Sequence, residues 1–258
     1  MATPNFTTLI HEAVNKPGTI MKAYSAFHNY SLGNQLLALV QCQLRGIAPG
    51  PINTFPRWQD LRRHVKKGEK ALTLCIPVTV KRKEIDGTGQ QREASFTTFV
   101  YKARWFVLAQ TDGEVMELPH MPTWDADKCL RALDVQQVAF TATDGNCQGY
   151  AKQRQIAINP VAQLPHKTLF HEVAHVVLGH TSEAEFSDSE NTPRNLREVE
   201  AEAVALICCE ALNLEGAEFC RGYIQEWIKR GTDSVIPEKC AQKILRVADQ
   251  ILKGGSTD

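Results

Sequence analysis

Apolar residues in the first 46 positions recur three and four residues apart, which is the spacing of one face of a helix. Leu9 and Ala13 show this spacing near the start, and Leu36, Leu37 and Val40 show it further on. Residues 16–18 read Lys-Pro-Gly, a combination that ends helices. The pattern therefore predicts helices over residues 6–46 with a break at residues 16–18.

A different pattern follows a Pro- and Gly-rich stretch at residues 47–56. The spacing of Trp58, Leu61 and Val65 indicates a short helix, and a basic turn at residues 66–70 leads to a strand-like run at residues 72–80. Residues 96–108 are again β-branched and aromatic, and the Asp-Gly pair at residues 86–87 marks a hairpin turn between the two runs. We expect helices followed by a small antiparallel sheet.

Between residues 111 and 127 the composition shifts to Gly, Pro, Asp and Glu, which is typical of a linker. Beyond it the pattern predicts a short helix at 127–133, strands at 138–141 and 155–159, helices at 166–179 and 194–212, and two amphipathic segments reaching residue 252. The sequence thus predicts an α+β protein of two domains. One is an N-terminal helical and antiparallel-sheet module at residues 1–115, and the other occupies residues 116–258.

The charge of the chain is divided between its two parts. The 258 residues are 43% hydrophobic, enough for a full core, and 29 basic residues balance 29 acidic ones. A net charge of zero argues against a partner with many negative charges. However, residues 1–110 hold 15 of the basic and 6 of the acidic residues, a net charge of +9, which leaves −9 for the remainder. The two parts are therefore expected to contact different partners.

No segment of the sequence indicates export or a membrane. The N-terminus lacks a basic stretch followed by an apolar core, and no apolar run approaches the ~18 residues of a membrane span. The eight cysteines are scattered and contain no C-x-x-C pair. We expect reduced thiols, a cytoplasmic protein and no membrane partner.

Residues His171-Glu172-Val173-Ala174-His175 match the pattern H-E-x-x-H. Residues four apart share one face of a helix, so both imidazoles can bind one Zn²⁺ ion while Glu172 reaches the water on that ion. The flanking residues are apolar nearly all round the helix, and burying ionisable side chains is costly unless a metal or partners compensate. The alternative is a pair of core histidines satisfied by hydrogen bonds.

A catalytic zinc ion needs a third protein ligand. Glu198 and Glu202 are four apart on a predicted apolar helix and share a face, whereas Glu200 points away. We assign Glu198 to the metal and Glu202 to the N–H of a ligand histidine, and the reverse assignment stays open. His180 is interpreted as a histidine at a helix end, not as a ligand. With Glu172 as the general base, the site is that of a zinc endopeptidase, and an extended peptide could pair with the strand at 155–159.

The basic half combines positive charge with aromatic residues. Basic groups contact phosphates and exposed aromatic rings stack on unpaired bases, a combination used to bind single-stranded nucleic acid. A solvated basic face without a partner is the alternative. The candidate DNA-binding residues are Tyr30, Trp58, Arg62, Arg63, Lys66, Lys67, Lys70, Lys81, Arg82 and Lys83.

Several motifs taken together resemble the ArdC-type antirestriction proteins of conjugative plasmids, over nearly the whole chain. They are residues 29–35 (Asn-Tyr-Ser-Leu-Gly-Asn-Gln), Trp58 with residues 65–70 (Val-Lys-Lys-Gly-Glu-Lys), Trp105-Phe106, the H-E-x-x-H motif, and Glu198 with Glu202. Ala174 and Val176 stand where closer relatives are expected to have Gly and an aromatic residue.

This resemblance implies a function. It implies an N-terminal domain that binds single-stranded DNA and a C-terminal zincin-like metallopeptidase domain of gluzincin type. It also implies a plasmid- or phage-associated protein that protects incoming DNA by acting on an unidentified protein substrate or host restriction component. Two alternatives are a non-catalytic DNA-shielding protein with structural zinc, and a metallopeptidase that cleaves a repressor or toxin.

Overall fold

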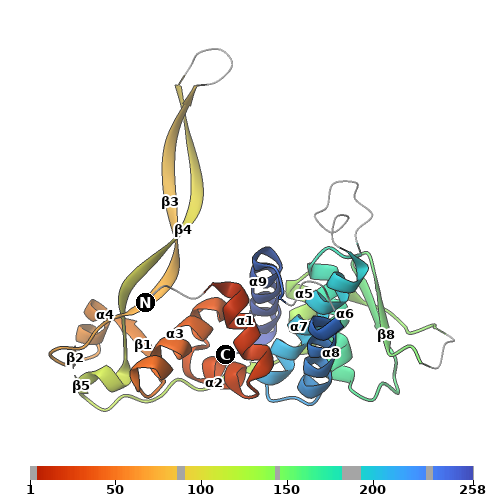
Figure 1. Ribbon diagram of the computed structural model, residues 1–258, viewed down its shortest axis with the longest axis horizontal. Helices are drawn as coiled ribbons and strands as arrows, with labels where there is room; N and C mark the ends of the chain where they lie inside the picture. Colours follow the sequence, from red (N-terminus) through yellow and green to blue (C-terminus); the bar gives the residue numbers. More distant parts are fainter. Residues whose placement is uncertain (1–4, 86–90, 143–145, 182–192, 231–234, 258) are drawn as a thin grey trace. The chain divides into compact units, whose positions relative to one another are not determined.

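Helices and short strands follow one another in the order of an α+β protein, as the sequence predicts. The computed structural model describes residues 5–85, 91–142, 146–181, 193–230 and 235–257, without the side chains of residues 83–85, 91–94 and 230. The chain divides into two compact units (Figure 1). Unit 1 contains residues 1–36 and 120–258, and unit 2 contains residues 37–119.

The N-terminal helices are α1 (Phe6–Asn15), α2 (Thr19–Phe27) and α3 (Leu32–Arg45). The predicted break at residues 16–18 is confirmed, and Gly18 has a φ of +79° there. A second break at residues 28–31 was not predicted. The Glu238 carboxylate accepts hydrogen bonds from the backbone N–H groups of Phe6 and Thr7, at 3.1 and 2.9 Å. Glu238 therefore satisfies two of the donors that the start of α1 leaves open.

Unit 2 is built around a sheet in the order β1-β4-β3, beside a second pair, β2 with β5. Trp58, Leu72, Leu74 and Val107 are buried in its core. The predicted helix at 58–65 begins earlier and ends at Asp60, because Arg62 has a φ of +53° and the chain then enters a strand. The elements are β1 (Ile52–Thr54), α4 (Phe55–Asp60), β2 (Arg63–Val65), β3 (Leu72–Ile85), β4 (Gln91–Val107), a 3-10 turn (Leu108–Gln110) and β5 (Thr111–Gly113).

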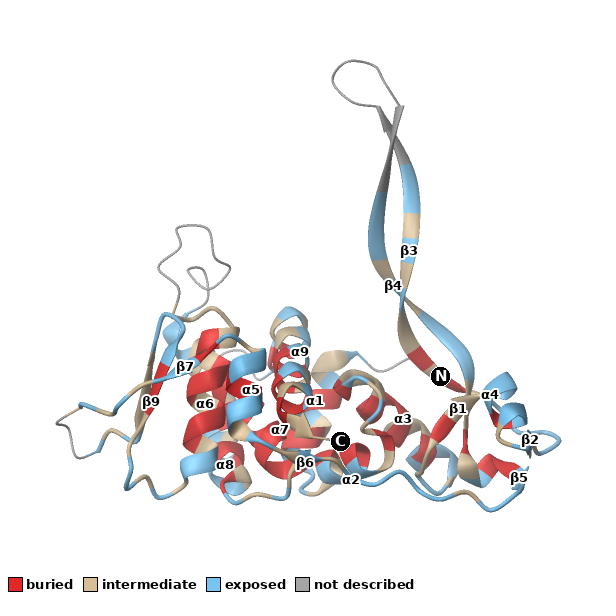
Figure 2. Ribbon diagram, turned by 180° about the vertical axis from the view of Figure 1, so that it is seen from behind, coloured by how far each residue is buried: buried red, intermediate tan, exposed pale blue. Residues whose placement is uncertain are grey.

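Strands β3 and β4 form a long antiparallel hairpin. Strand β1 pairs with only three residues of β4, Trp105 to Val107, so among the described residues most of the hairpin has no third strand. Figure 2 shows buried residues near the base of the hairpin and mostly exposed ones further along its described part. The turn predicted around residues 86–89 lies outside the described residues.

Helix α7 occupies the centre of unit 1. Every residue from Val199 to Ala211 is buried, and the helix packs against α2, α6, α8 and α9. This burial explains its run of Ala, Val, Leu and Ile residues. The helices of this part are α5 (Ala126–Ala132), α6 (Pro165–Val177), α7 (Arg194–Ala211), α8 (Ala217–Arg230) and α9 (Glu238–Gly255).

A small sheet in the order β7-β9-β8 packs against α6. Its strands are β7 (Gln136–Gln137), β8 (Gly149–Lys152) and β9 (Gln155–Ile158), and a separate pair joins β6 (Thr123–Trp124) to β10 (Ser256–Thr257). Strand β8 was not predicted, and the strand predicted at 138–141 is replaced by β7. The prediction that residues 155–159 accept a peptide at a free edge is wrong, because β9 is the central strand of this sheet.

The compact units have different limits from the predicted domains. The predicted boundary at residue 115 lies near the end of unit 2, but the first 36 residues group with the C-terminal part of the chain. Unit 2 holds 13 basic and 8 acidic residues, so it keeps an excess of positive charge. None of the eight cysteines, all within the described ranges, forms a disulfide. Among the described helices, none has the length and apolar character needed to cross a membrane.

Candidate metal centre and nucleic-acid interface

Helix α6 brings the two histidines of the H-E-x-x-H motif together. The helix begins at Pro165, a residue suited to the first turn, and is buried along much of its length. His171 and His175 are one turn apart, and their Nε2 atoms lie 3.1 Å from each other. Glu172 lies between them in the sequence, and its side chain, which ends in a carboxyl group, is buried. One helix thus carries two imidazoles and one carboxyl group into the protein interior.

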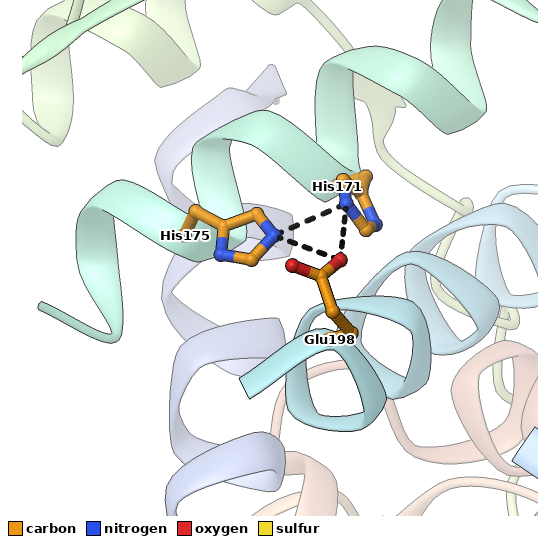
Figure 3. A group of neighbouring side chains, drawn as sticks. All are labelled: His171, His175 and Glu198. Atoms are coloured by element: carbon orange, nitrogen blue, oxygen red, sulfur yellow. Dashed lines mark hydrogen bonds and ion pairs between the residues drawn. The ribbon is translucent and has the colours of Figure 1, made fainter. Parts of the chain in front are cut away.

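Helix α7 adds a carboxylate to this pair. The Glu198 Oε2 atom lies 3.6 Å from the Nε2 atom of His171 and 3.6 Å from that of His175. Figure 3 shows the three side chains pointing toward one another from two helices. All three ligand atoms lie within 4.8 Å of one another. The structure therefore brings together the three residues that the sequence predicts as metal ligands.

These separations suit a single metal ion. Donor atoms about 2.0–2.1 Å from a tetrahedral ion lie about 3.3 Å from one another. The observed separations of 3.1, 3.6 and 3.6 Å fall around that value. Two imidazoles and one carboxylate are also a ligand set that Zn²⁺ accepts in catalytic sites. The residues present therefore fit a divalent ion at this position.

The other ring nitrogen of His171 faces a second carboxylate. His171 Nδ1 lies 3.3 Å from Glu202 Oε1, and the same oxygen accepts a hydrogen bond of 2.6 Å from Lys167 Nζ. Glu198 thus lies on the Nε2 side of the ring and Glu202 on the Nδ1 side. This is the arrangement expected when Glu198 binds the metal and Glu202 holds the ligand histidine in place. Metal binding itself stays a prediction.

The close charges of the cluster shift the pKa values of its histidine and glutamate side chains. Burial works to lower the pKa of His171, but Glu198 and Glu202 outweigh it and raise this pKa to about 9. Hydrogen bonds from His171 and His175 hold the pKa of the Glu198 carboxyl well below its usual range. Burial raises the pKa of Glu172, and the two histidines offset part of that rise. Glu198 is thus held as a ligand-competent anion, while Glu172 is the more basic of the two carboxylates.

His180 and Glu200 also belong to this region, which the sequence analysis did not foresee. Glu200 was expected to point away from the site, but its carboxylate lies 2.9 Å from His180 Nε2, and His180 Nδ1 lies 3.0 Å from His175 Nδ1. Glu200 is not in the described group of candidate ligands, as expected, but it is linked to that group by way of His180. No sequence signal identified this link, since the fold of the loop after α6 decides it.

Tyr223 of α8 is a second residue that the sequence analysis missed. It is 45% exposed. Burial raises the pKa of Tyr223, and the charges of Glu198 and Glu202 raise it further. The charges of two cluster carboxylates therefore act on its phenol. An aromatic residue in an amphipathic helix gives no signal of such a position.

Gly149 of strand β8 determines how closely the small sheet approaches α6. A methyl group at Gly149 would lie 2.7 Å from Thr168 Cγ2, 3.0 Å from the Ala157 carbonyl oxygen and 3.2 Å from Glu172 Cγ. Real side chains do not tolerate the first of these contacts. The absence of a side chain at this position thus allows the strand to pack directly against the turn of α6 that holds Glu172.

The basic residues at the start of unit 2 are partly engaged by the fold. Arg63 donates hydrogen bonds to the Thr111 side chain and carbonyl oxygen and to the Glu114 carbonyl oxygen. Arg62 forms an ion pair with Glu114 at 3.2 Å, and Lys66 forms one with Asp112 at 3.5 Å. These contacts join the chain segments of β2 and β5. Lys67 and Lys70 of the same stretch are exposed.

The two aromatic residues chosen from the sequence differ in how far they are buried. Trp58 has an exposed fraction of 0%, and its Nε1 donates a hydrogen bond of 2.9 Å to the Phe106 carbonyl oxygen. The prediction that Trp58 stacks on a base is therefore wrong, because the indole is part of the core of unit 2. Tyr30 is half-buried and belongs to unit 1.

The hairpin instead exposes three aromatic rings. Phe99 is 68% exposed, Phe96 49% and Tyr101 43%. Phe99 and Tyr101 lie two residues apart and therefore on the same face of β4. The exposed basic residues Lys81, Arg82 and Lys102 lie on the same two strands, and the side chain of Lys83 lies outside the described part. Positive charge and aromatic surface thus occur together on this hairpin.

The sequence analysis placed these rings in a strand but did not choose them as DNA-binding candidates. The available signal was the length of the two strands. A ribbon of two long strands leaves both of its faces uncovered wherever no helix or second sheet packs on it. Aromatic residues in the outer part of such a ribbon must be exposed.

Comparisons with known proteins find similarities in part of the sequence and in the fold. Residues 10–105 match the model of the N-terminal domain of the anti-restriction factor ArdC. The fold is similar to two crystal structures of the antirestriction protein ArdC from plasmid R388. The metal-free structure has a TM-score of 0.52 at 17% identity, covering 96% of this chain and 97% of that chain. The Mn(II)-bound structure has a TM-score of 0.54 at 18% identity, covering 96% of each chain. No curated protein matches by sequence.

Proposed function

We propose that this chain, an ArdC-type protein by its N-terminal domain and its fold, is an antirestriction protein with a metal-dependent peptidase site and a surface for single-stranded DNA. The two related structures carry the description antirestriction protein, and one of them holds Mn(II). The observation that carries the catalytic part is the convergence of His171, His175 and Glu198 within 4.8 Å, with Glu172 buried beside them. Zn²⁺ is the proposed ion, because this ligand set is that of zinc peptidases.

The residues of the chain would divide the work of peptide hydrolysis. His171 Nε2, His175 Nε2 and Glu198 would hold the ion, which when bound polarises the scissile carbonyl group and lowers the pKa of water. Glu172 would accept the proton of the attacking water, since burial raises its pKa toward the operating pH. It would then return that proton to the leaving amine. Glu202 would orient the His171 ring through Nδ1, with Lys167 holding Glu202.

The DNA-binding part of the proposal rests on the hairpin. Single-stranded DNA offers a phosphate backbone for Lys and Arg and unpaired bases for aromatic rings. Phe99 and Tyr101 are exposed on one face, and Lys81, opposite Ser95 in the register, lies on that same face of the ribbon. We expect log Kd to rise with log salt by about 0.7 for every phosphate that the protein neutralises.

A non-catalytic role is the competing function, because the exposed rings of the hairpin could bind DNA without any chemistry at the metal site. In that case the protein would shield DNA from host restriction, and the metal would serve the fold. Both functions use the same hairpin, so only the catalytic residue separates them.

The experiment replaces the general base while keeping the metal ligands. We expect Glu172→Gln to retain stoichiometric zinc and full affinity for single-stranded DNA but to lose peptidase activity by about 10²–10⁴-fold. The matched control is Glu215→Gln, which changes an exposed glutamate outside the cluster. Protection of incoming plasmid DNA is then measured in restricting cells for both variants. Protection by Glu172→Gln at the wild-type level would refute the peptidase account and support the shielding role.

A further inference from the structure

His180 and Glu200 form a buried line of polar contacts behind His175. His180 Nδ1 lies 3.0 Å from His175 Nδ1, and His180 Nε2 lies 2.9 Å from Glu200 Oε2. The side chains of His180 and Glu200 are only 3% and 1% exposed. Two such groups buried side by side are costly unless each satisfies the other's hydrogen bonds. Their position next to a candidate metal ligand points to a role beyond packing.

The end of helix α6 places His180 in this position. The helix ends at Val177, and Gly179 then adopts a φ of +81°, which glycine reaches without steric cost. The backbone N–H of His180 donates a hydrogen bond of 2.9 Å to the His175 carbonyl oxygen. The chain therefore turns back on itself, and the rings of His175 and His180 lie with centroids 5.1 Å apart.

The positions of the protons in this line follow from the chemistry of imidazole. A neutral ring carries one N–H and one acceptor nitrogen. If His175 binds a metal through Nε2, its proton is on Nδ1 and can only be donated to His180 Nδ1. His180 must then carry its own proton on Nε2 and donate it to Glu200. Every nitrogen in the line is satisfied by this single arrangement.

The geometry points to His180 and Glu200 as positioning residues, which together fix His175 in the tautomer that binds the metal through Nε2. This inference rests on the proposed metal centre. Glu200 accepts from His180 Nε2 and thereby leaves His180 Nδ1 as an acceptor. An acceptor at that position keeps the proton of His175 on Nδ1 and its Nε2 lone pair directed to the ligand cluster. Bonding partners of this kind hold ligand histidines in metalloproteins.

The two ligand histidines are then held in different ways. His171 Nδ1 faces the Glu202 carboxylate directly, at 3.3 Å. His175 reaches its carboxylate, Glu200, only through the second imidazole. All three glutamates at alternating positions of α7 would therefore serve one centre: Glu198 as a ligand, Glu202 for His171 and Glu200 for His175.

The experiment compares variants of His180 that keep or remove the acceptor. Zn²⁺ affinity of the full-length protein is measured by competition with a chelator, beside thermal unfolding of the metal-free protein. We expect His180→Phe, which fills the volume without an acceptor, to bind Zn²⁺ about 10–100-fold more weakly than the wild type. His180→Asn keeps an acceptor oxygen near the Nδ1 position and is expected to lose clearly less. The matched control for the His180 variants is His166→Ala, which changes an exposed histidine in the first turn of α6. Glu200→Gln is measured in the same way, and its matched control is Glu215→Gln.

A second readout works on the wild type alone. Long-range ¹H–¹⁵N NMR spectra of the zinc-loaded protein should show His175 protonated on Nδ1 and His180 on Nε2. Wild-type affinity in His180→Phe, or a proton on His180 Nδ1 in the loaded protein, would overturn the inference while leaving the metal centre intact. A wild type that binds no Zn²⁺ would overturn the metal centre and, with it, this inference. If His180→Phe unfolds, the NMR spectra decide the question.

Discussion

The α6–α7 cluster, which contains His171, His175 and Glu198 with their neighbours, buries side chains that are usually exposed. The β3–β4 hairpin exposes side chains that are usually buried. The cluster buries ionisable groups, among them Glu172, Glu200 and Glu202. The hairpin exposes large apolar rings, with Phe99 the most open of them. Buried charge and exposed aromatic surface both raise the free energy of the isolated fold unless something compensates.

This difference between buried ionisable groups and exposed rings indicates which kind of partner could stabilise each region. A partly buried group of anionic and imidazole ligands is compensated by a small cation. Rings exposed on a ribbon beside Lys and Arg are compensated by flat bases and phosphates. Under the proposed function, one region is completed by an ion and the other by a strand of nucleic acid. The following four predictions test this contrast, from the largest expected effect to the smallest.

Replacing a buried ring of unit 2 should lower its stability far more than replacing an exposed one. We expect Trp58→Ala to lower the free energy of unfolding of this unit by about 3–5 kcal/mol, because the indole fills the core. Hydrogen exchange at the amides of Leu72 and Leu74 measures it. Phe99→Ala is the control and should change unfolding by less than about 0.5 kcal/mol. Similar losses in both variants would show that the hairpin rings are structural.

Metal removal should affect the cluster and leave the hairpin unchanged. At a Zn²⁺ concentration 100 times the Kd, the bound ion should stabilise the fold by about 2.7 kcal/mol. Thermal unfolding with Zn²⁺ and with a chelator measures this difference for the wild type and for His171→Ala. The variant should show no difference. A wild-type protein that is equally stable under both conditions would contradict the cluster as a metal centre.

Removing one exposed ring of the hairpin should weaken DNA binding without affecting the metal. We expect Phe99→Ala to cost about 1–3 kcal/mol in affinity for an oligothymidine, the contribution of one stacked base. Fluorescence anisotropy at fixed salt measures it. Phe219→Ala, which removes a ring that is 69% exposed on α8, is the matched control and should bind like the wild type. Equal losses in the two variants would remove the hairpin from the interface.

Glu238 lies outside both regions, and it shows how much of the loss of stability at low pH comes from a carboxylate that is not part of the cluster. Partial burial works to raise the pKa of Glu238, but hydrogen bonds from Thr7 and Phe6 outweigh it and lower this pKa. Its stabilising effect is thus complete above the unfolded pKa of about 4.3 and is lost as the pH falls through the lower folded value. We expect Glu238→Gln to lower the free energy of unfolding by about 1 kcal/mol at pH 7. Below pH 4 the difference in free energy of unfolding between the variant and the wild type should become smaller, which unfolding measured over a range of pH would show. A gap independent of pH would contradict the role of its charge.

The sequence predicted the α6–α7 cluster better than the exposed surface of the hairpin, for a physical reason. His171, Glu172 and His175 lie within one helical turn, and Glu198 and Glu202 lie within another, so helix geometry alone fixes which side chains share a face. The exposure of a ring such as Phe99 depends on whether other strands cover the sheet. That is a property of the whole fold, and composition alone does not determine it.

The same reasoning explains the remaining differences. The break at residues 16–18 was predicted because proline and glycine act locally. The place of β9 between two partners, the burial of Trp58 and the contact of His180 with His175 all depend on chain reversals, which the residue pattern does not specify. The contact of Glu200 with His180 was not predicted, because only the helix of Glu200 was considered and not residues 178–180, which follow α6.

Gly149 carries no functional group, yet its missing side chain constrains the position of Glu172. In a library of random substitutions scored only for activity, we therefore expect this position to tolerate few changes, although it carries no reactive group. Such a map, used alone, would count an inert residue among the reactive ones. Conversely, an engineer who wishes to shift Glu172 by a fraction of an ångström could begin at this strand, where no charge is altered.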